Sequence, residues 1–63
     1  MALTKKHYEM VARQIRDTRA EYHFNLEVTE ALGLLTEKLA NNFAEDNPRF
    51  RRKMFLNACD PNI

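Results

Sequence analysis

Apolar residues in the first third of the chain recur at intervals of three and four, which is the spacing of one face of a helix. They are Tyr8, Val11, Ala12 and Ile15, and Arg19 continues the same spacing. Thr4 precedes this stretch and can accept a hydrogen bond from a free amide of the first turn, while Leu3 can pack on Tyr8 as a hydrophobic staple. We therefore predict a first helix over residues 5–20.

The strongest helical pattern lies in the middle of the chain. An apolar stripe extends there over about five turns, and its members are Val28, Ala31, Leu32, Leu35, Leu39, Ala40 and Phe43, with Leu34 at its edge. Gly33 lies inside this stretch and costs about 0.5 to 1 kcal/mol relative to alanine. Three interpretations of Gly33 remain open: it is simply tolerated, it allows a close helix crossing, or it acts as a hinge. We predict a second helix over residues 26–45.

The stretch between these two helices is ambiguous, because apolar and polar residues alternate there as in a half-buried strand. Its apolar members are Tyr22, Phe24, Leu26 and Val28. A single strand has no pairing partner within this chain, so we interpret residues 20–25 as a connection. Asn25 and Thr29 are both candidates for the N-cap of the second helix.

Asn47 followed by Pro48 indicates the start of a third helix. Proline at the first helical position loses no hydrogen bond, and the residue before it is pushed into the extended conformation of an N-cap. The apolar residues that follow are Phe50, Met54, Phe55 and Ala58, and Pro61 ends any continuation. We predict a third helix over residues 48–59.

Three helices with short connections predict a small all-α three-helix bundle, a single domain over residues 1–63. The single glycine and two prolines disfavour a β domain rich in turns. A chain of 63 residues hides only about 60 % of the surface that it exposes when unfolded. Homodimerisation that completes the core is therefore an open alternative to a monomer.

Residues for catalysis or metal binding are sparse and scattered. His7, His23 and Cys59 stand singly, without the paired spacing of metal ligands or of a nucleophile with its base. One glycine cannot form a phosphate-binding loop. We expect no enzyme activity, no metal and no cofactor, and we interpret Cys59 as a packing residue at a helix end.

The expected setting is the cytoplasm. A single cysteine cannot form an internal disulfide. No signal-peptide pattern is visible, and no apolar run approaches the roughly 20 residues of a membrane-spanning helix. We therefore expect no membrane association.

The formal net charge of +1 conceals a strong segregation of charge. Residues 1–22 carry five basic and three acidic side chains, residues 23–47 carry one and five, and residues 48–63 carry four and one. On a helix from residue 48, Arg49, Arg52 and Lys53 gather on one edge. This edge could contact an acidic protein partner, phosphates or the acidic middle of the chain itself, with Lys5 and Lys6 as a second basic group.

Two other functions are compatible with these patterns. The second and third helices suggest a helix-turn-helix that binds nucleic acid, although Glu45 and Asp46 would lie near the DNA backbone and the turn lacks glycine. The other is a structural homo-oligomer in which the stretch from Tyr22 to Val28 supplies pairing between subunits.

Both ends of the chain resemble a group of very short, uncharacterised proteins encoded by bacteriophages and prophages. The N-terminal match is Leu-Thr-Lys-x-His-Tyr, here Leu3, Thr4, Lys5, His7 and Tyr8. The C-terminal match is Phe-Ala-x-Asp-Asn-Pro-x-Phe-x-Arg-x-x-Phe-Leu-x-Ala-Cys, here Phe43, Ala44, Asp46, Asn47, Pro48, Phe50, Arg52, Phe55, Leu56, Ala58 and Cys59. Arg51 and Asp60 depart from this pattern, because an acidic residue and a glycine are usual there. The resemblance implies a phage-type origin and a cytoplasmic setting but no particular activity.

We therefore expect a non-enzymatic accessory protein of phage type that binds another protein, a host or phage factor, and modulates it. Nucleic acid is a less favoured partner, because the acidic residue that the group usually has at the position of Arg51 would be out of place in a phosphate-binding site shared by the group. The candidate partner-binding residues are Arg49, Arg52, Lys53, Lys5 and Lys6.

Overall fold

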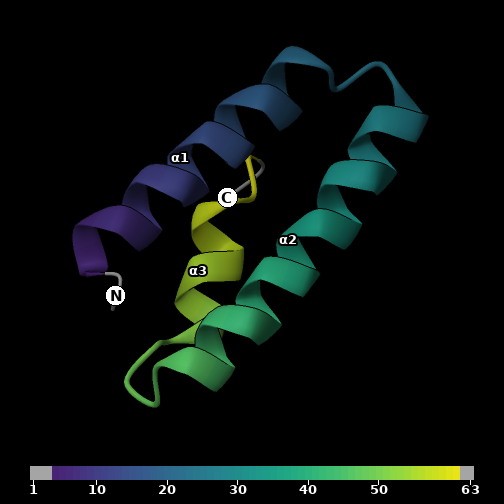
Figure 1. The fold of residues 1–63 in the computed structure, drawn as a ribbon. Coiled ribbons are helices and arrows are strands. Elements are labelled where there is room, and N and C mark those ends of the chain that lie inside the picture. The colour runs from purple at the N-terminus through teal and green to yellow at the C-terminus, as the bar shows by residue number, and fades with distance from the viewer. Residues whose placement is uncertain (1–3, 62–63) are drawn as a thin grey trace.

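The computed structural model describes residues 4–61, and this range contains three helices and no strand. Helix α1 is Lys5–Glu21, α2 is Leu26–Asp46 and α3 is Arg52–Ala58. The two long helices form a hairpin, and the short α3 packs against both near the end that holds the start of α1 (Figure 1). The predicted all-α three-helix bundle is confirmed. Leu3, the predicted staple residue, lies outside the described range.

The starts of the first two helices agree with the predictions. Thr4 is the extended N-cap of α1, and its backbone N–H donates to Nδ1 of His7 over 3.1 Å. Asn25, rather than Thr29, is the N-cap of α2, and its side-chain oxygen accepts the backbone N–H of Val28 over 3.1 Å. The alternating stretch is a turn followed by the first turn of α2, so it forms no strand.

The predicted start of the third helix at Pro48 is wrong, because α3 begins at Arg52. The preceding residues form a turn in which the N–H of Phe50 donates to the Asn47 carbonyl over 3.0 Å, and the N–H of Arg49 donates to Oδ1 of Asn47 over 3.0 Å. Asparagine followed by proline suits the first two positions of such a turn as well as a helix start. Packing of the Phe50 ring decides between the two.

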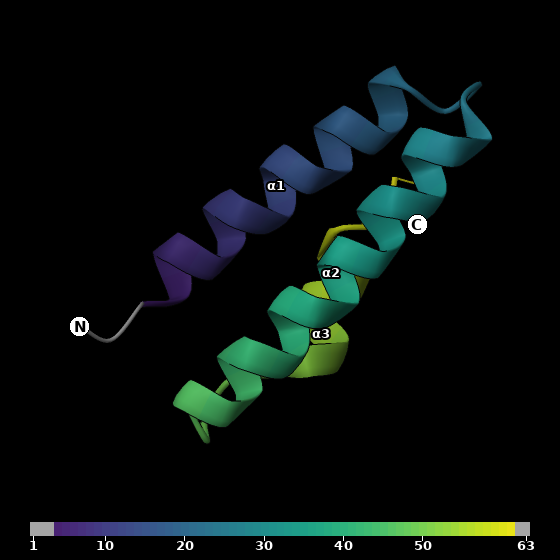
Figure 2. The ribbon, with the colours of Figure 1, turned by 45° about the vertical axis from the view of Figure 1, so that its right-hand side comes forward.

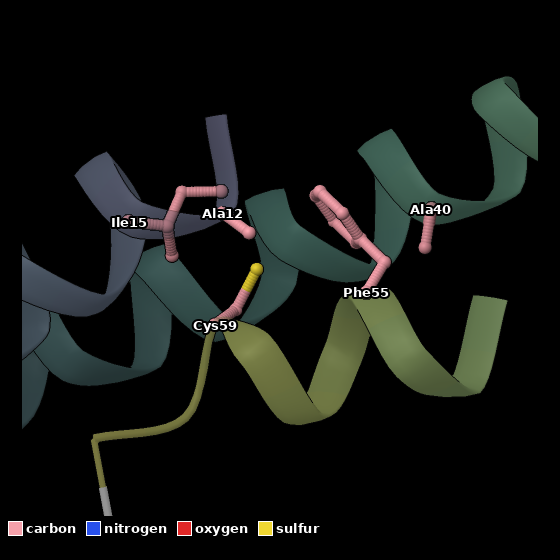
Figure 3. Close-up of a cluster of buried hydrophobic side chains, with 5 residues drawn as sticks. All are labelled: Ala12, Ile15, Ala40, Phe55 and Cys59. Carbon is pink, nitrogen blue, oxygen red and sulfur yellow. The ribbon is translucent and has the colours of Figure 1, made fainter. Parts of the chain in front are cut away.

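Three small residues, one isoleucine and one aromatic ring make up the buried hydrophobic core among the described residues. Its members are Ala12, Ile15, Ala40, Phe55 and Cys59, which come from all three helices and the end of α3 (Figure 3). Three of the five have short side chains, so the backbones can approach closely around the Phe55 ring. The core therefore lies where α3 meets the hairpin.

Four aromatic rings extend this core toward the turn. Tyr8 lies 4.9 Å from Phe43 and 4.7 Å from Phe50 between ring centroids, and Phe55 lies 5.5 Å from both Phe43 and Phe50. Such tilted and edge-on pairs contribute about 0.5 to 1.5 kcal/mol each beyond area burial. The cluster joins α1, α2, the turn and α3. Its contacts keep Phe50 in the turn, so that α3 does not extend back to this residue.

The apolar stripe of α2 is only partly covered. Leu34 and Leu35 are 62 % and 47 % exposed, whereas the neighbouring Thr36 is buried and its hydroxyl donates to the Leu32 carbonyl over 2.7 Å. The seven residues of α3 extend about 10 Å, against about 31 Å for the 21 residues of α2. Within residues 4–61, α3 therefore does not reach the end of the hairpin at the α1–α2 connection (Figure 2).

Gly33 does not mark a close helix crossing. A β-carbon added there would meet no atom within 4 Å outside its own helix backbone. Its backbone does not have a positive φ, so no left-handed conformation requires glycine.

Candidate binding groove between α1 and α3

A groove of about 600 Å³ lies between the first half of α1, the turn after α2, and α3. We call it the α1–α3 groove. Its uncharged lining consists of Tyr8, Ala12, Asn47, Phe50, Met54, Phe55 and Ala58, and its charged lining consists of Lys5, Glu9, Arg49 and Arg51. The groove thus has an aromatic and aliphatic surface, and most of its charged side chains are cationic.

Hydrogen bonds from Asn47 hold the aromatic wall in place. The side-chain amide of Asn47 donates to the Tyr8 hydroxyl over 3.3 Å, and its Oδ1 accepts the backbone N–H of Arg49. One side chain thereby connects α1, the end of α2 and the turn that presents Arg49. The groove wall is built on the packed end of the bundle rather than on a loose loop.

Three cations and one anion line the groove. Lys5 Nζ lies 3.9 Å from Glu9 Oε1, one helical turn away, and both side chains are well exposed. An exposed pair of this kind contributes about 0.3 to 0.5 kcal/mol and leaves both groups accessible. The side chain of Arg51 passes 3.9 Å from the sulfur of Met54. The groove therefore has an excess of positive charge beside its apolar lining.

The structure brings together only some of the predicted binding residues. Arg49 and Lys5 both line the groove. Arg52 is directed to α2, where its Nε donates to Oδ1 of Asn41 over 3.0 Å. Lys6 and Lys53 are exposed and do not line the groove. The predicted single edge of Arg49, Arg52 and Lys53 does not form, because Arg49 precedes α3 and lies in the turn.

Arg51 was missed as a candidate. The sequence marked it only as a departure from the phage-protein pattern, whereas in the structure it is the N-cap of α3 and lines the groove. A turn predicted over residues 47–50 would have made Arg51 a candidate, because such a turn redirects the chain after Phe50. Asn47 and Pro48 fit a helix start equally well, so the sequence alone did not indicate the turn.

Cys59 is a packing residue at the end of α3, and it is fully buried. Burial raises the pKa of its thiol from 9.0 to about 11, and the positive charge of Arg19 opposes part of this shift. Arg19 Nη1 donates to the Cys59 carbonyl over 3.4 Å, so an arginine from α1 satisfies the C-terminal end of α3. At neutral pH the thiol is protonated, a form that is neither nucleophile nor metal ligand.

Within residues 4–61, no three side chains among histidine, cysteine, aspartate and glutamate are grouped so that they could hold a metal ion. None of the described helices combines the length and the apolar character needed to cross a bilayer. No family model, no curated protein and no solved structure matches this chain.

Proposed function

We propose that the protein acts by binding another protein, without catalysis, and that the α1–α3 groove receives an acidic amphipathic segment of that partner. The observation that carries this proposal is the lining of the groove. Aromatic and aliphatic side chains lie beside Lys5, Arg49 and Arg51, and Glu9 is the only acidic residue of the lining in the part of the chain that the structure describes. A segment with apolar residues flanked by aspartate or glutamate matches both features.

Each part of the groove contributes differently to such binding. Fully burying a large apolar side chain of the partner contributes about 1.5 to 3 kcal/mol, so two of them supply most of the affinity. The cations increase the association rate and select against basic segments. Because Asn47 and the aromatic cluster already order the wall, little conformational entropy is lost there on binding.

The resemblance of both chain ends to short phage-encoded proteins supports a setting for this activity. We place the protein in the cytoplasm of a bacterial host, as an accessory protein that modulates a host or phage factor. The groove provides a means of docking on that factor without altering its chemistry.

A nucleic-acid function is less favoured by the geometry. Helix α3 has only seven residues, about two turns, which is short for a recognition helix in a major groove, and its Arg52 is hydrogen-bonded to Asn41 of α2. Glu45 and Asp46 are exposed at the end of α2, immediately before the turn. Phosphates approaching the turn would meet both carboxylates.

The test pans a random peptide library on the immobilised protein and then measures the affinity of the enriched peptides. The groove variant is Arg49→Glu with Arg51→Glu, and the matched control is Lys6→Glu with Lys53→Glu, which makes the same change in net charge away from the groove. Circular dichroism verifies the fold of both. A fluorescent DNA duplex at low salt is titrated in parallel.

We expect enriched peptides with apolar residues next to aspartate or glutamate. Their affinity should fall about tenfold or more in the groove variant and change little in the control. Equal loss in both variants, or enrichment of basic peptides, would contradict the groove assignment. Duplex binding that the groove variant abolishes, without any peptide binding, would reassign the function to nucleic acid.

A further inference from the structure

The connection between α1 and α2 and the first residue of α2 together expose three large apolar side chains. Tyr22, Phe24 and Leu26 are 47 %, 88 % and 75 % exposed. The ring of His23 packs against Phe24, with 3.8 Å between the two ring centroids. We call residues 21–27 the hairpin tip. Exposed apolar side chains clustered at one end of a small domain are typical of a binding surface.

The hairpin tip is also acidic. Residues 20–37 contain four glutamates and no lysine or arginine. Glu21 and Glu27 bound the tip on its two sides, and both are exposed. Apolar side chains next to carboxylates are the chemistry that the α1–α3 groove complements with its aromatic lining and its three cations.

The tip and the groove lie toward opposite ends of an elongated molecule. The chain measures 35 × 20 × 18 Å, with the α1–α2 connection at one end and the turn before α3 at the other (Figures 1 and 2). A two-fold axis perpendicular to the long dimension would pair two antiparallel copies and bring each tip to the groove of its partner. Two equivalent contacts form in such a pair, and the assembly closes as a dimer.

We infer that the α1–α3 groove receives the hairpin tip of a second copy of this chain, in a reciprocal antiparallel dimer. The inference rests on the proposed function in one respect, which is that the groove binds protein. Phe24 is the anchor in the groove, and Glu21 and Glu27 face its cations. The external partner and the second copy compete for one surface, so dimerisation sets the concentration of free grooves.

Two contacts per pair are needed to reach the area of a stable dimer. A specific interface buries about 800 Å² on each partner, which is about one sixth of the 5158 Å² surface of this chain. An aromatic side chain can bury about 150 to 250 Å², so one tip alone falls well short of that area. The reciprocal arrangement adds the groove surface and the tip of each copy, and it leaves neither tip exposed.

The first arm of the test measures mass by sedimentation equilibrium from about 1 µM to about 1 mM. The tip variant is Phe24→Ser, and the control is Met10→Ser, an apolar residue that is 46 % exposed and belongs to neither surface. We expect a wild-type dimer, a dissociation constant raised about tenfold or more by Phe24→Ser, and no change in the control. A wild-type monomer throughout, or a Phe24→Ser protein that dimerises like wild type, would overturn the inference.

The second arm exchanges charge between the two surfaces. One chain carries Glu21→Lys with Glu27→Lys, and the other carries Arg49→Glu with Arg51→Glu. Each chain alone meets like charge at both of its contacts, whereas a mixture pairs opposite charges at both. We expect two monomeric variants that form a heterodimer when mixed, and a mixture that stays monomeric refutes the reciprocal arrangement.

The two proposals fail separately. Phe24→Ser leaves the groove intact, so it should retain or improve the affinity for library peptides while it loses self-association. A monomeric wild-type protein that binds acidic peptides would refute only the dimer. A charge-exchanged heterodimer without any peptide binding would refute only the external partner.

Discussion

Ionisation of Cys59 should make the stability of the protein fall at alkaline pH. Its thiol has a folded pKa of about 11, against 9.0 when unfolded, because burial disfavours the thiolate. The folded state therefore keeps its proton at a pH where the unfolded state has lost it. The resulting stabilisation is complete below pH 9 and is lost as the pH rises toward 11.

The magnitude follows from these two pKa values. At about pH 10.5, ionisation of the unfolded thiol exceeds that of the folded thiol enough to remove about 2 kcal/mol from the free energy of unfolding. At about pH 7.5 the same effect is negligible. A domain of this length has a total stability of roughly 3 to 9 kcal/mol, so the change is a large fraction of it.

The assay is urea unfolding followed by far-UV circular dichroism, under reducing conditions, for the wild type and for Cys59→Ala. Other groups that ionise at alkaline pH are common to both proteins and cancel in the difference. We expect the wild type to lose about 2 kcal/mol more than Cys59→Ala between the two pH values. Parallel losses in the two proteins would refute the assignment of a raised thiol pKa to burial.

Three further substitutions, measured by thermal and urea unfolding, test the core, the C-terminal end of α3 and the glycine inside α2. Phe55→Ala should cost about 3 to 5 kcal/mol, because it empties the centre of the core, and a cost below about 1 kcal/mol would contradict the burial of that ring. Arg19→Met keeps most of the aliphatic stem but removes the bond to the Cys59 carbonyl, so we expect a loss of about 1 kcal/mol, and an unchanged stability would mean that water replaces the guanidinium there. Gly33→Ala should stabilise the protein by about 0.5 to 1 kcal/mol because the added methyl group meets open space within a helix, and destabilisation would indicate a neighbour at that position.

The candidate site was only partly accessible from the sequence. The basic character of the last segment predicted Arg49 as a contact, and the first turn of α1 predicted Lys5. The groove itself was not predicted, because its lining comes from residues up to about fifty positions apart that meet only after α3 packs on α1. Arg51 and the bond from Arg19 to the end of α3 belong to the same class of long-range consequence.

The sequence by itself determined the local structure of this protein. Apolar spacing set the two long helices nearly to the residue, and Thr4 and Asn25 set their starts, because periodicity and capping depend only on near neighbours. The tertiary structure decided everything that depends on which surfaces meet. Asn47 and Pro48 suit a turn and a helix start equally well, and the Phe50 ring selected the turn because it packs on Tyr8, Phe43 and Phe55. That choice shortened α3 and placed Arg49 and Arg51 at the α1–α3 groove. The spacing of neighbouring residues carries no information about contacts between residues far apart in the chain, so only the tertiary structure could decide which surfaces meet.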